Sequence, residues 1–328
     1  MGGELAKKGL EPESAALLQQ LQAGNGEVLD HSDVAGLRVK MASFMKDAGP
    51  RILPVKTVKR RTLQVSDREI ETLQYWPPEQ AGGAPSGLPP ILVYFHGGAF
   101  THFSADTHDA VARYLCNRSG CLVVSVSYRL APEHKFPAAV DDAYAAVCWV
   151  AAHAEELGGD PRKVVVAGES AGGTLSIAVC LAAKEHGEPR IALQVPLCPS
   201  LTLHEIQKYP SWQTLGGGEF LLSAGSIDEI KSLYLPRPQD ALNPLVSPIL
   251  ARDLAGLPPA LIVTAQFDPL VDEAAHYGQR LRAAGVAVTY ECFAGTVHSF
   301  MIMAGVISLG YAALDLVAAR IASLLGSG

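Results

Sequence analysis

Short apolar runs alternate with stretches of helical periodicity over most of the chain. The runs predict strands at residues 91–95, 122–126, 164–167, 192–196, 260–264 and 288–293. Helical patterns follow four of them, at about 138–157, 171–184, 271–284 and 305–325. Continuously apolar strands separated by helices are typical of a mainly parallel sheet with both faces covered. The pattern therefore predicts an α/β fold.

Two regions interrupt this alternation. Residues 1–50 carry helical patterns, and two alternating runs at 55–65 and 69–75 then predict antiparallel strands. The interval 199–245 is irregular, with Trp212, three successive glycines and several prolines. We expect this insertion to form a cap together with the N-terminal helices. The predicted division is a core of residues 51–198 and 241–328 and a cap of residues 1–50 and 199–240.

Composition narrows the class of protein. The chain has 328 residues, of which 48% are hydrophobic, enough for a sizeable core. The net charge of −7 argues against a nucleic-acid partner, because phosphate binding needs a basic face. One basic cluster falls in the first alternating run, and we expect it to be the solvated face of an edge strand. Its members are Lys56, Lys59, Arg60 and Arg61.

Targeting and membrane signals are weak. The first eight residues contain no apolar core of a secretory signal. The six cysteines lie mostly in apolar segments without a C-x-x-C pair, so we expect buried thiols in a reducing, cytoplasmic compartment. Residues 292–314 lack Asp, Glu, Lys and Arg, but their polar residues and three glycines favour a strand end, a loop and a buried helix over a membrane span.

The sequence Gly168-Glu169-Ser170-Ala171-Gly172 lies between a predicted strand and a predicted helix. This G-x-S-x-G pattern, in that context, is typical of a nucleophile elbow, which presents a serine hydroxyl at the mouth of a site. Glycines on both sides allow the tight turn and the close approach of neighbouring backbone. Ser170 is therefore the candidate nucleophile.

A serine nucleophile needs a base, and the base needs an acidic residue that orients it. Asp268 and His298 each follow the end of a predicted strand, in the chain order Ser–Asp–His. Because parallel strands end at one edge of a sheet, we expect both side chains to lie beside Ser170. The alternatives are a helix N-cap for Asp268 and a structural role for His298, and Asp272 and Glu273 are rivals for the acidic role.

The segment 96–100 also follows a predicted strand and contains two glycines. Backbone N–H groups in such a loop, with the N–H that follows the nucleophile, are the donors that an oxyanion intermediate requires. An ordinary strand-ending turn is the alternative. The candidate donors are Gly97, Gly98, Ala99 and Ala171. The spacing of His96, His102 and His108 matches no metal-binding pattern, and we expect no metal or other cofactor.

Four segments resemble the hormone-sensitive-lipase-like family of α/β-hydrolases, which contains many microbial carboxylesterases. They are residues 96–100, 128–142 and 168–173, and Asp268-Pro269-Leu270 with His298. The resemblance spans roughly residue 90 to the C-terminus and is weak in the first 50 residues and in 199–235, where that family has a variable cap. It implies the α/β-hydrolase fold, and structural roles for Glu133, Asp141 and Asp142.

Two positions depart from the family's pattern. Ala99 replaces a third glycine, which puts the donor geometry of its N–H in question, and Glu169 replaces an aspartate but keeps its charge. A receptor branch of the family has lost the catalytic histidine. Retention of His298 therefore favours an enzyme.

These features predict a serine carboxylesterase (EC 3.1.1 type) that acts through an acyl-enzyme on short- to medium-chain, small-molecule esters. An acyltransferase on the same frame and a small-molecule binding protein with a vestigial site are the alternatives. We expect activity to fall at acid pH, with a midpoint near the ordinary histidine pKa of about 6.5. Candidate pocket residues, each alternatively a core residue, are Phe44, Trp212, Phe220 and Met301. The resemblance is compatible with a homodimer, and the sequence leaves the oligomeric state open.

Overall fold

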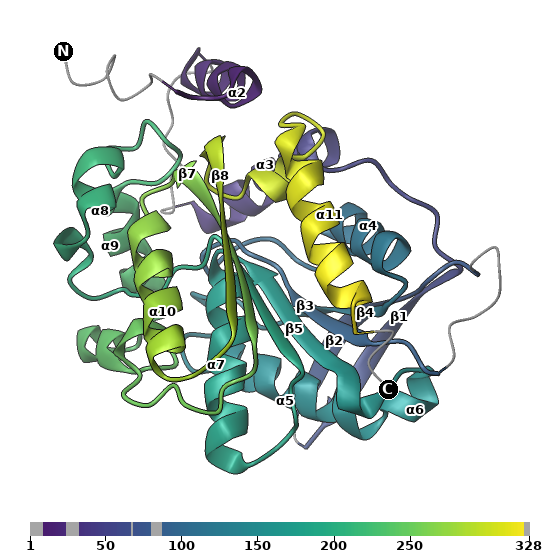
Figure 1. The fold of residues 1–328 in the computed structure, drawn as a ribbon. Coiled ribbons are helices and arrows are strands. Elements are labelled where there is room, and N and C mark those ends of the chain that lie inside the picture. Colours follow the sequence, from purple (N-terminus) through teal and green to yellow (C-terminus); the bar gives the residue numbers. More distant parts are fainter. Residues whose placement is uncertain (1–8, 24–32, 67, 80–86, 325–328) are drawn as a thin grey trace.

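The computed structural model describes residues 9–23, 33–66, 68–79 and 87–324. Within these residues, eight strands form one sheet in the order β1-β2-β4-β3-β5-β6-β7-β8 (Figure 1). The β1–β2 and β2–β4 pairs are antiparallel and the other neighbours are parallel. The strands are β1 (Thr57–Val65), β2 (Arg68–Trp76), β3 (Ile91–Phe95), β4 (Leu122–Ser127), β5 (Val164–Glu169), β6 (Leu193–Leu197), β7 (Ala260–Phe267) and β8 (Val288–Val297).

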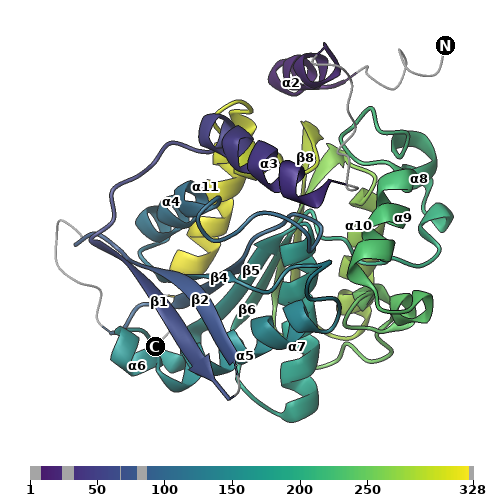
Figure 2. The same cartoon turned by 180° about the vertical axis from the view of Figure 1, so that it is seen from behind.

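Helices cover both faces of the sheet, as Figures 1 and 2 show from opposite sides. One hydrophobic cluster joins Val93 and Val166 to the helices of one face, and another joins Leu92 and Val165 to those of the other face. The central strands are thus buried on both sides, which explains their continuously apolar sequences. The first face carries α5 (Ala138–Ala152), α6 (Ala154–Leu157), α7 (Ala171–His186) and α10 (Val271–Ala283), and the second carries α4 (Asp109–Ser119) and α11 (Leu309–Ala322).

The two segments predicted to form a cap are helical in part. The N-terminal segment holds α2 (Pro12–Ala23) and α3 (Val34–Ala48), and the insertion holds α8 (Pro210–Leu215) and α9 (Ala224–Tyr234). Figure 1 places these helices around the carboxyl ends of the parallel strands. Both segments contribute side chains to the wall of one cavity, described below. This shared wall is what a cap formed by the two segments would produce, and the division into core and cap stays a prediction.

The structure differs from the predicted elements in three places. The helix predicted over 138–157 is interrupted at His153, which has φ −110° and ψ 16°. The last helix begins at Leu309, because residues 304–308 form an irregular turn after the 3₁₀ helix Phe300–Met303. Helix α4 was not predicted, although Gly120 at its end, with φ 69°, is a typical C-terminal signal.

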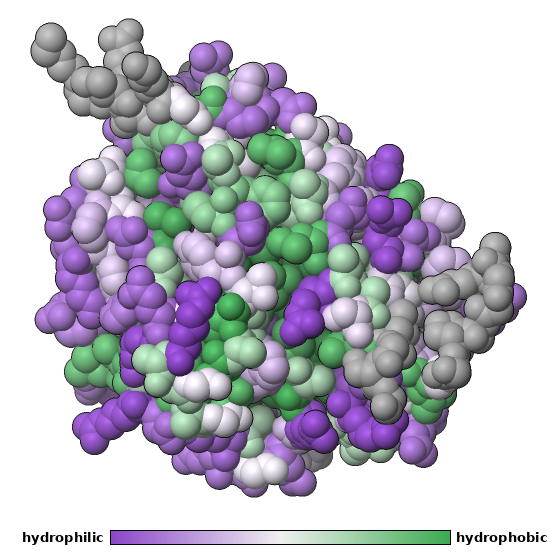
Figure 3. Space-filling view, viewed as in Figure 1, coloured by the Kyte–Doolittle hydropathy of each residue, from purple (hydrophilic) through white to green (hydrophobic). Residues whose placement is uncertain are grey.

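The basic cluster predicted for the first alternating run lies at an edge of the sheet. β1 is an edge strand, and Arg60 and Arg61 on it pair with Asp106 and Glu156. Figure 3 shows hydrophobic residues gathered over the opposite edge strand, β8, between α10 and α11, on a face that also carries many hydrophilic residues. Among the described residues, no helix is both long and apolar enough to cross a membrane.

Helix α7 packs against β3 at a point where two backbones nearly touch. A Cβ atom on Gly172 would overlap the carbonyl oxygen of Phe95. We expect Gly172→Ala to lower the free energy of unfolding by about 3 kcal/mol or more, because backbone atoms cannot move aside as a flexible side chain can. The shift in the midpoint of urea unfolding measures this effect.

Gly225→Ala is the matched control, because Gly225 is a helical residue of α9 whose Cβ would meet only Ser223 Oγ at 3.7 Å. Helix propensity alone makes this change neutral or stabilising by up to about 1 kcal/mol. Equal midpoints for the two variants would contradict the close-approach argument.

Candidate active site

Ser170 stands in the turn between β5 and α7, with φ 54° and ψ −117°. A non-glycine residue rarely adopts a positive φ, so the surrounding structure must hold this conformation. The Ser170 N–H donates to the carbonyl oxygen of Leu197 at 2.8 Å. A Cβ on Gly168 or on Gly172 would overlap backbone of the same region, so both glycines are required by the turn.

The structure brings Ser170, Asp268 and His298 together. His298 Nε2 lies 3.0 Å from Ser170 Oγ, and His298 Nδ1 lies 2.8 Å from Asp268 Oδ2. Asp268 follows β7 and His298 follows β8, so three strand ends supply the three side chains. The second carboxylate oxygen of Asp268 accepts the N–H of Leu270 at 2.9 Å, which fixes the carboxylate from behind.

The rival acidic residues hold the inserted segment instead. Asp272 Oδ2 accepts the N–H of Ser211 at 2.8 Å, and the hydroxyl of Ser211 donates to the Pro269 carbonyl at 2.6 Å. Glu273 Oε1 accepts the N–H of Leu201 at 2.7 Å, and burial raises the pKa of Glu273 well above its ordinary value. Neither carboxyl group is hydrogen-bonded to His298 in this arrangement.

The environment of His298 favours a protonated ring more than water does. Burial by itself lowers the pKa of His298, but the contacting Asp268 carboxylate and the nearby Glu169 carboxylate outweigh it and raise this pKa above its ordinary value. The same two charges would stabilise an imidazolium at this position.

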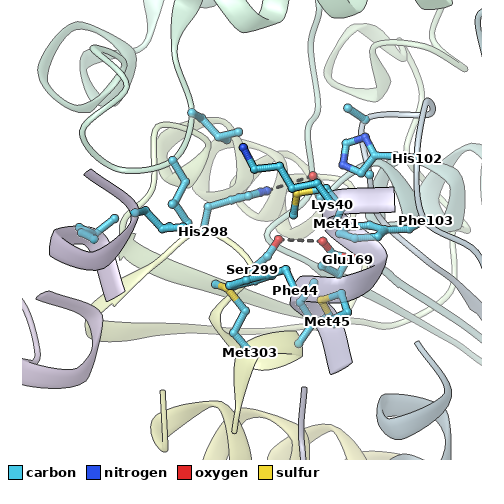
Figure 4. Close-up of a pocket in the computed structure, with 18 of the residues that line it drawn as sticks. Lys40, Met41, Phe44, Met45, His102, Phe103, Glu169, His298, Ser299 and Met303 are labelled. Carbon is cyan, nitrogen blue, oxygen red and sulfur yellow. Dashed lines mark hydrogen bonds between the residues drawn. The ribbon is translucent and has the colours of Figure 1, made fainter. Parts of the chain in front are cut away.

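Glu169, which the sequence showed only as a negative charge next to Ser170, has a structural role. Its buried carboxylate accepts the Ser299 hydroxyl at 2.8 Å, and its other oxygen lies 3.5 Å from His108 Nε2. Burial opposes ionisation, yet His108, Ser299 and His298 together lower the pKa of Glu169, so it is an anion. Figure 4 shows the Glu169–Ser299 contact beside the cavity.

The loop after β3 supplies the candidate oxyanion donors. Gly98 has φ 96°, Ala99 has φ 52° and Phe100 has φ 62°. None of the described residues accepts a hydrogen bond from the N–H of Gly98 or Ala99, and both residues line the same cavity as Ser170. Ala99, which replaces the third glycine of the family's pattern, thus adopts the positive φ that a glycine would allow more easily.

The other two candidate donors lie at the edges of this group. Ala171 is the first residue of α7, where an N–H has no partner within the helix. Gly97 does not line the cavity; it packs against Glu169, whose carboxylate would overlap a Cβ at this position. Its carbonyl accepts the hydroxyl of Tyr128 at 3.2 Å. Gly97 therefore shapes the loop.

Within the described ranges, the clustered histidines do not belong to a group whose metal-ligand atoms converge. His96 stacks on Tyr128 with ring centroids 4.2 Å apart, and burial lowers the pKa of His96 to about 3, so this ring is neutral. Among the described residues, one group offers metal-ligand atoms within 4.8 Å of one another: Cys198, Asp268 and His298. Burial keeps the Cys198 thiol protonated by raising its pKa, and the 2.8 Å contact between the other two side chains is shorter than two ligands of one zinc ion allow.

A cavity of about 370 Å³ lies beside Ser170 and His298. Its wall is mostly apolar and comes from both predicted cap segments and from the turn after β8 (Figure 4). The apolar lining residues are Leu18, Leu21, Met41, Phe44, Met45, Phe103, Leu221, Leu222, Ile230, Ile302 and Met303.

Of the predicted pocket residues, Phe44 lines this cavity and the other three do not. Trp212, Phe220 and Met301 are buried in the hydrophobic clusters. Leu221 and Ile302, the immediate neighbours of Phe220 and Met301, line the cavity instead. Side-chain direction in an irregular segment or a 3₁₀ turn has no simple period to read from sequence.

Comparison with known proteins agrees with this architecture. Residues 92–302 match the family model described as alpha/beta hydrolase fold. The carboxylic ester hydrolase LipN of Mycobacterium tuberculosis is 43% identical over 239 residues, which are 71% of this chain and 61% of LipN. An arylesterase of Saccharolobus solfataricus is 35% identical over 292 residues, covering 89% of this chain and 92% of the relative.

Solved structures extend the likeness to nearly the whole chain. The hyperthermophilic esterase from the archaeon Pyrobaculum calidifontis has a TM-score of 0.87 and 37% identity, and the match covers 96% of this chain and 99% of the esterase. The chain therefore belongs to the α/β-hydrolases, in the hormone-sensitive-lipase-like group of microbial carboxylesterases.

Proposed function

We propose that ester hydrolysis by this chain runs through an acyl-enzyme formed on Ser170, with His298 as the base and Asp268 as the residue that orients it. The observation that carries the proposal is the continuous hydrogen-bonded series from Ser170 Oγ to His298 at 3.0 Å and on to Asp268 at 2.8 Å. Family relatives named as esterases supply the reaction class.

The steps follow from this geometry. His298 Nε2 accepts the Ser170 proton as Oγ bonds to the ester carbonyl carbon. The N–H groups of Gly98, Ala99 and Ala171 stabilise the oxygen anion of the tetrahedral intermediate. The imidazolium then gives its proton to the leaving alcohol as the C–O bond breaks. A water molecule, deprotonated by the same ring, releases the acid product and restores the serine.

The cavity supports esters with short- to medium-chain acyl groups. Its volume of about 370 Å³ is near the lower limit of typical ligand pockets. Its apolar wall favours a hydrocarbon chain. The intact hydrogen-bonded series from Ser170 to Asp268 counts against a binding protein with a vestigial site. An acyltransferase would form the same acyl-enzyme, so this series does not distinguish it from a hydrolase. The homodimer compatible with the resemblance and the cytoplasmic location expected from the sequence stay predictions.

Replacing the nucleophile tests the proposal directly. We expect Ser170→Ala to lower kcat for a chromogenic short-chain ester by at least about 10³-fold, because the covalent route is lost. The thermal midpoint should stay close to that of the wild type. Ser176→Ala in α7 is the control, since its hydroxyl donates to the Gly173 carbonyl at 2.7 Å; it should keep activity and cost about 1 kcal/mol of stability. Wild-type turnover by Ser170→Ala would exclude the mechanism.

The pH dependence of kcat/KM tests the electrostatics. The ring of His298 must be neutral to accept the serine proton, so activity falls as the pH drops through its pKa. Because this pKa is raised, the midpoint should lie above the value of about 6.5 expected from the sequence.

Glu169→Gln removes one of the charges that raise the pKa of His298, so its midpoint should lie below that of the wild type. Glu185→Gln, which changes an exposed carboxylate near the far end of α7, is the control and should leave the midpoint in place. A Glu169→Gln profile that coincides with the wild-type profile would show that the Glu169 charge does not act on His298.

A chain-length series from acetyl to palmitoyl esters tests the size of the cavity. We expect a maximum at short to medium acyl chains and a shift toward longer chains in Phe44→Ala, because Phe44 is part of the cavity wall. Trp212→Phe is the control, since Trp212 is buried elsewhere, and its profile should not shift. A profile that favours palmitoyl esters in the wild type would refute the size argument.

A further inference from the structure

Arg38 on α3 reaches from the N-terminal cap segment to two separate parts of the core. Its Nε donates to the carbonyl oxygen of Thr101 at 2.8 Å, and its Nη2 donates to the carbonyl oxygen of Ala131 at 3.1 Å. Its two terminal nitrogens also donate to the Glu133 carboxylate, each at 2.8 Å. All of these acceptors lie in core segments near the loop that carries the candidate oxyanion donors.

The backbone acceptors of Arg38 are directly tied to that loop. The N–H of Thr101 donates to the Gly98 carbonyl at 2.9 Å, and the N–H of Ala131 donates to the Phe100 carbonyl at 2.9 Å. Between these anchors, Ala99 and Phe100 both have positive φ. Two successive non-glycine residues keep such a conformation only when their surroundings hold it. The guanidinium bonds the two residues that brace this strained pair.

The same helix forms one side of the cavity. Lys40, Met41, Phe44 and Met45 follow Arg38 on α3 and line the cavity, and Figure 4 shows them with His298 and Glu169. Apolar contacts are not directional, so they hold a helix against its neighbour without fixing its position along the contact. Directional hydrogen bonds from Arg38 supply that restriction.

We infer that Arg38 is a positioning residue for ester hydrolysis. It holds helix α3, which forms one wall of the cavity, in a fixed position relative to the loop that carries the candidate oxyanion donors Gly98 and Ala99. The inference rests on the function proposed above. A guanidinium is required because its planar fork donates to several acceptors at once, whereas an ammonium group at this position reaches fewer of them.

The exposed ion pair alone does not account for this arrangement. The side chains of Arg38 and Glu133 are 30% and 54% exposed, and pairs of this kind contribute little in water. Thr101, in contrast, is fully buried, and its carbonyl accepts from the guanidinium inside the core. The effect of the ion pair on catalysis can therefore be measured apart from that of the backbone hydrogen bonds, with one substitution for each.

The experiment compares Arg38→Lys with Glu133→Gln on a short-chain chromogenic ester, with kcat referred to the titrated serine. Arg38→Lys keeps the positive charge and loses the fork, so we expect kcat to fall by about tenfold or more and KM to rise, with the acid midpoint of the pH profile unchanged. Glu133→Gln keeps the backbone bonds and should change kcat by less than about threefold.

Arg61→Lys is the matched control, because the Arg61–Glu156 pair is similarly exposed and lies on β1, away from the loop. It should leave kcat and KM unchanged. If Arg38→Lys does not fold, Arg38→Gln takes its place, since an amide still donates one hydrogen bond.

Unchanged kcat and KM in the Arg38 variant, whatever its thermal midpoint, would overturn the inference, because they would leave Arg38 a purely structural role. A shifted acid midpoint would also overturn it, by locating the effect at His298. If Ser170→Ala keeps wild-type activity, the proposed function fails and this inference with it; if Ser170→Ala is inactive and Arg38→Lys is normal, this inference alone fails.

Discussion

The backbone contact between α7 and β3 is the constraint on which the site depends. Gly172 packs against the carbonyl of Phe95, and Gly168 packs against both Gly172 and Phe95. Phe95 is also the last residue of β3, directly before the loop that carries Gly98 and Ala99. One close approach therefore fixes the distance between Ser170 and the loop that carries Gly98 and Ala99, and it does so through main chain, which has fewer ways to relax than side chains.

Strained backbone gathers around this contact. Ser170, Ala99, Phe100 and Ser299 all have positive φ, a conformation that costs of the order of 1–3 kcal/mol for each such residue. The buried carboxylate of Glu169 connects three of the segments involved: Glu169 is the last residue of β5, packs against Gly97 and accepts a hydrogen bond from Ser299, next to His298. A buried carboxylate thus links the turn at Ser170, the loop after β3 and the loop after β8, which accounts for a charged residue at a position that is only 2% exposed.

Sequence predicted the parts of the site that local patterns determine. The elbow was readable because glycines, an apolar strand and a helix stand in immediate succession, and Asp268 and His298 were readable because strand ends meet at one edge. The direction in which Trp212, Phe220 and Met301 point could not be predicted from the sequence, since it depends on how an insertion and a short turn pack on the core. The contacts of Arg38 join residues 63 and 93 positions apart, and no periodicity in the sequence signals such a distance.

The inserted segment is held on the acid-bearing loop by its own main chain. The N–H groups of Leu201 and Ser211 bond Glu273 and Asp272, and one hydroxyl bonds Pro269, next to Asp268. Of the insertion's side chains, these contacts use a single serine. Exposed side chains elsewhere in the insertion can therefore change without breaking these main-chain bonds, whereas Phe220 stacks on Phe267, next to Asp268, and is part of the packing there. The attachment thus leaves room for variation at the surface of the insertion while the surroundings of Asp268 stay in place.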